Sequence, residues 1–178
     1  MHILETERLI LRPPCRADVA AMAGWLGDYQ VSKNLARVPH PYGEDDAEAF
    51  VALREIQDEA HYSFTIQRRC DNVLLGGVGL HWEEQGWEFG YWLGRPFWGR
   101  GYATEAAARL VDFAFQSLEA SHVWAGWYHD NPASGHVLHK LGLTHNGSSM
   151  RDSLARQGKV LCHGMRLTRA DFLRKEAA

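Results

Sequence analysis

The sequence predicts an α+β fold, in which a mixed, mostly antiparallel sheet carries one parallel strand pair near its centre. Three strand-like segments with short turns between them, at 62–68, 73–81 and 87–93, are typical of an antiparallel meander. A helix then separates 87–93 from a further strand at 122–128. Because such a crossover is right-handed and brings its two strands parallel, these two strands are expected to be neighbours. The 178 residues fit one domain, 1–178, with a hydrophobic core.

Shorter elements are expected before the meander. A strand at 8–12 ends at two prolines, 18–26 is helix-like, and 27–43 combines a short helix with a loop. A longer helix begins at 44–46, because acidic side chains favour a helix N-terminus. Its expected apolar stripe consists of Ala49, Leu53, Ile56 and Ala60.

After the meander, a helix follows a glycine turn and a second helix runs from Asn131 to Leu141. Asn131 and Pro132 suit a helix start, and Gly142 suits a C-terminal cap. Two strands at about 144–150 and 160–168 are expected to close the domain. The buried face of the first helix is expected to be Ala103, Ala107, Leu110, Val111, Ala114 and Leu118.

The composition excludes several classes of protein. Hydrophobic residues make up 46% and charged residues 23%, as in a globular protein, and the net charge of −3 gives no basic footprint for nucleic acid. No apolar run reaches the roughly 18 residues needed to span a membrane, and no signal-peptide core is present, so a cytoplasmic protein is expected. Cys15, Cys70 and Cys162 lack zinc-ligand spacing, and His136 and His139 lack a third ligand, so no metal is expected.

The glycine turn before the first long helix is the clearest functional signal. In Trp98-Gly-Arg-Gly-Tyr-Ala-Thr104, small residues lead directly into an alanine-rich helix. Backbone N–H groups at such a helix N-terminus bind phosphate. The P-loop pattern fails because Lys and Ser/Thr do not follow the second glycine, and the dinucleotide pattern fails because Thr104 replaces its third glycine. A phosphate-bearing ligand of another kind is expected.

Several motifs together resemble the GNAT N-acetyltransferase superfamily. They are Trp98-Gly-Arg-Gly-Tyr-Ala-Thr-Glu-Ala106, Asn131-Pro-Ala-Ser134 and Lys140-Leu-Gly-Leu143. The segments 6–12 and 88–92 resemble its RimJ/RimL-like branch, which acetylates the N-termini of ribosomal proteins. Trp98 departs from the superfamily pattern, in which Gln or Arg stands at that place.

The resemblance implies a GNAT-like fold with a splayed parallel strand pair and acetyl-CoA as co-substrate. The implied reaction is direct acetyl transfer to a primary amine, with a protein N-terminus as one acceptor. Two alternatives stay open: a small-molecule amine (amino acid, polyamine or antibiotic) as acceptor, and a non-catalytic acyl-CoA-binding or sensing module. A homodimer contact through surplus aromatic residues is one option for a further partner.

The resemblance also assigns roles to residues of the turn and of the second helix. Backbone N–H groups of Arg100, Gly101, Tyr102, Ala103 and Thr104 would hold the pyrophosphate of acetyl-CoA. Asn131 would contact the pantetheine arm, and Ser134 would donate a hydrogen bond or a proton to the departing thiolate. Helix capping alone is the alternative explanation of both segments.

Glu88 is the candidate base, by resemblance to superfamily members with a glutamate at this place. Apolar neighbours are expected to raise its pKa. A water chain, or an ion pair between Glu88 and an arginine, is the alternative. The backbone N–H of Trp92 or Leu93 would stabilise the oxyanion if the strand splays, and Gly90 and Gly94 would permit a bulge there. The acceptor groove is expected from 20–43, 81–87 and 145–163.

Overall fold

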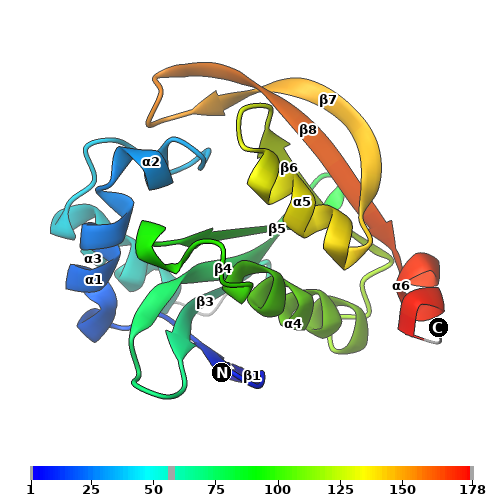
Figure 1. The fold of residues 1–178 in the computed structure, drawn as a ribbon, viewed down its shortest axis with the longest axis horizontal. Coiled ribbons are helices and arrows are strands. Elements are labelled where there is room, and N and C mark those ends of the chain that lie inside the picture. Colours follow the sequence, from blue (N-terminus) through cyan, green and yellow to red (C-terminus); the bar gives the residue numbers. More distant parts are fainter. Residues whose placement is uncertain (1, 56–58, 177–178) are drawn as a thin grey trace.

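A single eight-stranded sheet runs through the molecule in the order β1-β2-β3-β4-β5-β6-β8-β7 (Figure 1). The computed structural model describes residues 2–55 and 59–176. No helix within these two ranges is long and apolar enough to cross a membrane. The strands are β1 Leu4–Glu5, β2 Leu9–Arg12, β3 His61–Arg68, β4 Leu74–Glu83, β5 Gly86–Leu93, β6 His122–Tyr128, β7 Thr144–Ser153 and β8 Gly158–Thr168.

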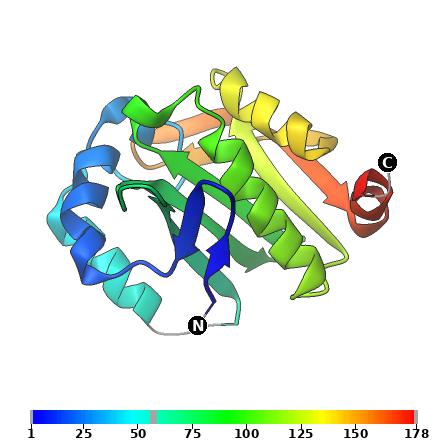
Figure 2. The same cartoon turned by 60° about the horizontal axis from the view of Figure 1, so that its bottom comes forward.

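Helices lie around this sheet, and α4 runs across one face of it (Figure 2). The core joins α4 to the strands, and a smaller apolar cluster joins α1 and α3 to Leu74 of β4. The helices are α1 Val19–Leu26, α2 Tyr29–Ser32, α3 Glu44–Glu55, α4 Tyr102–Gln116, α5 Pro132–Leu141 and α6 Arg169–Glu176, with 3₁₀ turns at Arg16–Asp18 and Arg95–Phe97. The predicted α+β class with a mixed sheet is confirmed.

The parallel strands β5 and β6 separate almost at once. Their ladder pairs only Trp87 with Val123 and Glu88 with Trp124, so Phe89–Leu93 has no ladder partner on that side among the described residues. On its other side β5 pairs with β4 from Gly86 to Leu93 without a register shift. The expected bulge at Gly90 and Gly94 is therefore not formed. The sheet opens because β6 diverges from β5.

The apolar stripe expected on α3 is wrong. In α3 the buried residues are Ala47 and Val51, whereas Ala49 and Leu53 of the expected stripe are exposed and Ile56 lies outside the described residues. Both pairs have i, i+4 spacing, so periodicity alone could not choose between them. The expected face of α4 is confirmed, with Ala107, Leu110, Val111 and Ala114 buried and Ala103 and Leu118 packed against the core.

The helix α6 was not predicted, since the strand at 160–168 was expected to end the fold. It packs on the end of α4, where the Phe172 and Phe115 rings stack with centroids 4.6 Å apart. Arg169 Nη1 also donates to the carbonyl of Phe115 at 2.5 Å. These contacts fix the end of β8 against α4.

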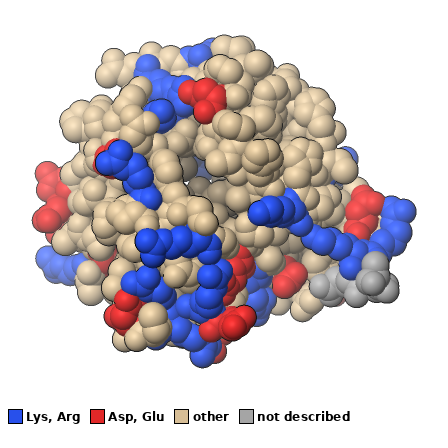
Figure 3. Space-filling view, in the orientation of Figure 1, with Lys and Arg blue, Asp and Glu red and all other residues tan. Residues whose placement is uncertain are grey.

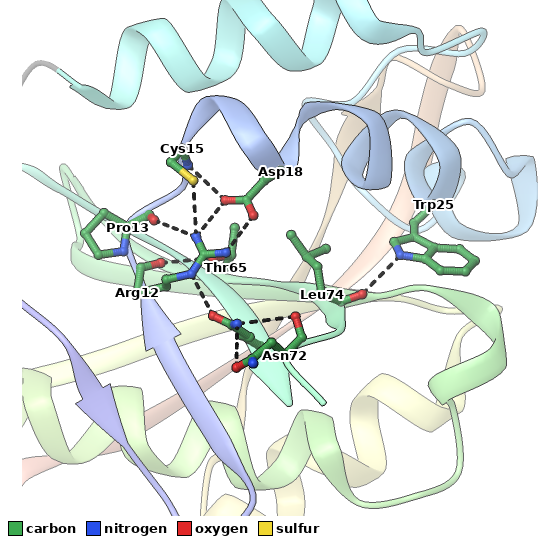
Figure 4. A network of polar contacts seen from close by, with 9 residues as sticks. Arg12, Pro13, Cys15, Asp18, Trp25, Thr65, Asn72 and Leu74 are labelled. Atoms are coloured by element: carbon green, nitrogen blue, oxygen red, sulfur yellow. Dashed lines mark hydrogen bonds and ion pairs between the residues drawn. The ribbon is translucent and has the colours of Figure 1, made fainter. Parts of the chain in front are cut away.

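A buried ion pair anchors the start of α1 to the sheet (Figure 4). Arg12 donates to both carboxylate oxygens of Asp18 at 2.7 Å, and its Nε donates to Gln67 Oε1 at 2.7 Å. Asp18 is only 4% exposed, and the backbone N–H of Cys15 donates to it at 2.9 Å. Burial by itself raises the pKa of Asp18, but the hydrogen bonds from Arg12 and Cys15 outweigh it and leave the pKa below its ordinary value.

Replacing Arg12 by methionine is expected to lower the free energy of unfolding by about 3 kcal/mol, because a buried carboxylate loses its partner. The pKa of Asp18 is lowered in the folded protein. The Arg12–Asp18 pair therefore stabilises the folded protein fully at pH values above the ordinary pKa of about 4, and this stabilisation is lost as the pH falls through the pKa of the folded state. The difference between wild type and variant in urea unfolding should therefore shrink below about pH 4.

Arg69→Met is the matched control, because the Arg69–Glu5 pair is exposed on both sides. Its expected cost is at most about 1 kcal/mol. Equal costs for the two variants would contradict a special contribution of the buried pair.

Candidate active site

The glycine turn presents unpaired helix amides, as the sequence predicts. Gly99 and Gly101 have φ of 71° and 80°, in the left-handed region that favours glycine, and α4 begins at Tyr102. Within the described part of the chain, no side chain caps this helix start. The first amides of a helix have no partner within the helix, so those of Tyr102, Ala103 and Thr104 are available to a ligand.

An acidic residue in the same helix turn is neutralised locally. Glu105 accepts from Arg8 Nε at 2.6 Å and from Thr6 Oγ1 at 2.6 Å. Arg8 Nη1 also donates to the carbonyl of Arg100 at 3.2 Å. Arg8 therefore compensates the negative charge of Glu105, the acidic residue in the first turn of α4. It also ties the turn to the N-terminal strands.

A cavity of about 680 Å³ lies next to the turn and along the diverging strands. Figure 3 shows this face hollowed near its centre, with Lys and Arg side chains gathered below the hollow. Each of the segments 20–43, 81–87 and 145–163 contributes lining residues to this cavity. Of the predicted site residues, only Arg100 is absent from the lining, which includes Glu88, Trp92, Leu93, Gly101, Tyr102, Ala103, Thr104, Asn131 and Ser134.

The geometry of β5 distinguishes its two candidate oxyanion donors. The N–H of Gly94 donates to the carbonyl of Leu75 on β4 at 2.8 Å. Backbone groups alternate in direction along a strand, so the N–H of Trp92 also points to β4 and that of Leu93 points to the opening. The carbonyl of Leu93 accepts from Trp98 Nε1 at 2.8 Å, on the side away from β4. Leu93 is the better placed donor.

At the start of α5, a partly buried tyrosine contacts Ser134. The Oγ of Ser134 lies 2.8 Å from the hydroxyl oxygen of Tyr91, and the Ser134 backbone N–H donates to Asn131 Oδ1 at 3.4 Å. Asn131 thus has the capping role that its sequence context predicts. Burial raises the pKa of Tyr91 to about 12, although the hydrogen bond to Ser134 opposes this. Sequence analysis missed Tyr91, whose position three residues after Glu88 already places it on the other face of β5.

Glu88 is held from two sides. Its Oε2 lies 3.0 Å from His81 Nε2, and its Oε1 accepts from Arg151 Nη1 at 2.6 Å. Arg151 comes from β7 and stacks over the ring of Trp124 at 4.7 Å. His81, Glu88 and Trp124 are register partners on β4, β5 and β6, so they share one face of the sheet.

The expected rise in the pKa of Glu88 is wrong. Burial does raise it, but the hydrogen bond with His81 and the charge of Arg151 outweigh burial, and the pKa lies below its ordinary value. The expectation considered only neighbours on the same strand. The alternative of an ion pair with an arginine is confirmed.

A second cavity of about 510 Å³ meets the first at Ala36, Arg37, Glu88 and Arg151, which line both. Its other charged lining residues are Glu83, Glu84 and Asp152. His81, Glu83 and Glu88 offer ligand atoms within 4.8 Å of one another, the only such group among the described residues. Arg37 and Arg151 already pair with the two glutamates, which favours a charge network over a cation site.

Solved structures share this fold. A spermidine N-acetyltransferase from Vibrio cholerae in complex with CoA and spermine superposes with a TM-score of 0.80 at 19% identity, covering 94% of this chain and 99% of that one. A ribosomal L7/L12 α-N-protein acetyltransferase, RimL, in complex with CoA superposes with a TM-score of 0.81 at 17% identity, covering 94% and 98%. These likenesses concern the fold.

Fold and sequence together define an acyltransferase. Residues 8–144 match the family model described as "Acetyltransferase (GNAT) domain". The N-acetyltransferase p20 of Bacillus licheniformis is 30% identical over 165 residues, which cover 90% of this chain and 92% of that protein. The chain therefore belongs to the GNAT family of N-acetyltransferases, enzymes that act on amines.

Proposed function

We propose that the chain, as one unit over 1–178, transfers the acetyl group of acetyl-CoA directly to a primary amine, with a protein N-terminal amine as the first acceptor class. The observation that carries this proposal is the opening between β5 and β6. It brings helix amides, a strand amide and the Glu88 carboxylate to one cavity. The likeness to RimL supports the choice of acceptor class.

Acetyl-CoA fits the chemistry of this cavity. The amides of the 100–104 turn would hold the diphosphate, since the left-handed glycines keep side chains out and the helix dipole favours negative charge. A Cβ added at Gly99 would meet no atom within 4 Å, so there is open space beside the turn. Asn131, at the start of α5, would face the pantetheine arm.

The two proton transfers would take place on opposite faces of β5. The amine attacks the thioester carbonyl, and the N–H of Leu93 stabilises the oxyanion of the tetrahedral intermediate. Glu88, directly or through water, takes the proton that the amine loses. On the other face, Ser134, hydrogen-bonded to Tyr91, gives a proton to the thiolate when the C–S bond breaks and regains one from water. Direct transfer is favoured because burial raises the pKa of the Cys162 thiol, which makes it a poor nucleophile.

A polyamine is the second candidate acceptor. The smaller cavity carries the carboxylates of Glu83, Glu84, Glu88 and Asp152 against two guanidinium groups, those of Arg37 and Arg151. This excess of negative charge favours an acceptor with more than one ammonium group. The likeness to the spermidine enzyme is consistent with such an acceptor.

A panel of amines tests the proposal, with free CoA thiol as the readout. It contains peptides with varied first residues, spermidine, single amino acids and an aminoglycoside, each beside a reaction without amine. Thiol release well above the amine-free rate with peptides supports an N-terminal acceptor, and release with spermidine alone moves the assignment to polyamines. Tight acetyl-CoA binding without release for any amine would overturn the enzyme in favour of an acyl-CoA-binding module.

A further inference from the structure

We propose that His81 is the second proton carrier of this site: it receives the acceptor's proton from Glu88 and releases it to solvent on the side of Glu83. This inference rests on the proposed function and deepens it. It assigns a proton-carrying role to one of ten histidines that the sequence alone could not rank.

The geometry provides a path that leads outward. Nε2 of His81 lies 3.0 Å from Oε2 of Glu88 and 3.6 Å from Oε1 of Glu83. The exposed fraction of the side chains rises from 12% at Glu88 to 21% at His81 and 39% at Glu83. A proton on Glu88 therefore has one neighbouring acceptor that is itself closer to water.

The surrounding charges stabilise a transient imidazolium. The carboxylates of Glu83 and Glu88 face His81 Nε2. Each is also bound by an arginine, so both keep their positions when the imidazole gains or loses a proton. Histidine is the side chain whose ordinary titration falls between pH 5 and 8, which suits a proton carrier at neutral pH. The titratable groups next to His81 are Glu83 on β4, Glu88 on β5 and, by register, His61 on β3. Arg37 after α2 and Arg151 on β7 bind the two carboxylates.

The steps balance without any added co-reactant. The acceptor nitrogen loses a proton to a carboxylate oxygen of Glu88, which becomes a carboxylic acid. That O–H bond breaks as the lone pair of His81 Nε2 takes the proton, and Glu88 returns to a carboxylate. The imidazolium then gives the proton to water, and its Nδ1–H is kept throughout.

A structural role for His81, in which it only holds Glu88, predicts a different outcome from a relay. A relay that lacks its imidazole can use imidazole from the buffer, whereas a missing support cannot be replaced in this way. His81→Ala is therefore measured with and without added imidazole. His139→Ala, on the exposed side of α5, is the matched control.

For His81→Ala, kcat is expected to fall about 10- to 100-fold with little change in the KM for acetyl-CoA. Imidazole should restore much of the rate in a concentration-dependent manner, and should leave wild type and His139→Ala unchanged. An undiminished kcat, or a loss that imidazole does not restore in a variant that still binds acetyl-CoA, would overturn the relay.

A second measurement does not depend on turnover, so failure of the relay can be told apart from failure of the proposed function. The imidazole nitrogens of His81 are observed by ¹⁵N NMR in wild type, Glu83→Gln and Glu88→Gln. Each variant removes a negative charge beside Nε2, so the Nε2 resonance should shift in both. An Nε2 resonance that is unchanged in Glu88→Gln refutes the coupling, whatever the acceptor. The wild-type rate of thiol release tests the proposed function itself.

Discussion

Glu88→Gln is expected to lower kcat about 100- to 1,000-fold while acetyl-CoA binding stays close to that of wild type. The amide has the size of the carboxylate but cannot take the proton of the amine. It also leaves the guanidinium of Arg151 without its counter-ion at 2.6 Å. Because the pKa of Glu88 is lowered, its carboxylate is ionised throughout the neutral range. If the kcat of wild type already falls as the pH is lowered towards about 5, the protonation of another group must cause that fall.

The measurement is steady-state thiol release at saturating acetyl-CoA, with affinity followed by calorimetry. Glu48→Gln, on the exposed side of α3, makes the same chemical change away from the cavity and should leave both quantities unchanged. A Glu88→Gln variant within a few-fold of wild type would show that water alone removes the proton. A variant that fails to bind acetyl-CoA would instead indicate a structural role for the Glu88–Arg151 pair.

Gly101→Asp is expected to weaken acetyl-CoA binding by about 2–3 kcal/mol, or roughly 30- to 150-fold in Kd. Gly101 has a φ of 80° and directly precedes the first amides of α4. A carboxylate at this position places a negative charge beside the amides that would bind the diphosphate. The nearest atom to an added Cβ is Arg8 Nη2 at 3.3 Å, the flexible end of a side chain, so the substitution can be accommodated.

Gly101→Asn separates charge from shape. Aspartate and asparagine have nearly the same size, and both tolerate the left-handed region better than other residues. The asparagine variant should therefore keep most of the affinity in calorimetry. Equal affinities for the two variants would mean that the diphosphate is not bound at this helix start.

The chain contains strong local signals for the elements that frame the cavity. The meander, the crossover through α4 and the caps of α5 each depend on residues close in sequence, such as Asn131 with Pro132 and Gly142, and all are formed. The helix α6 carries few apolar residues, and the contact that orders it is between Phe172 and Phe115. A local pattern could not reveal that packing.

The surroundings of Glu88 were beyond prediction for a related reason. Arg151 is 63 residues away in sequence and reaches the site because β8 lies between β6 and β7. The alternation of side chains along β5 predicts neither the order of the strands nor the direction in which the Arg151 side chain points. Charge and hydrogen bonding from distant strands therefore reversed the direction of a pKa shift that local apolarity predicted.

The last paired residue before β5 and β6 separate is Glu88 itself, opposite Trp124. The two strands thus form a wedge with the carboxylate at its vertex, and a vertex moves least when the arms of a wedge change their angle. Acceptors of different bulk could be accommodated by changes farther along the arms, while the proton-accepting oxygen keeps its position. Substrate range and chemical step can then diverge independently in evolution, within one architecture.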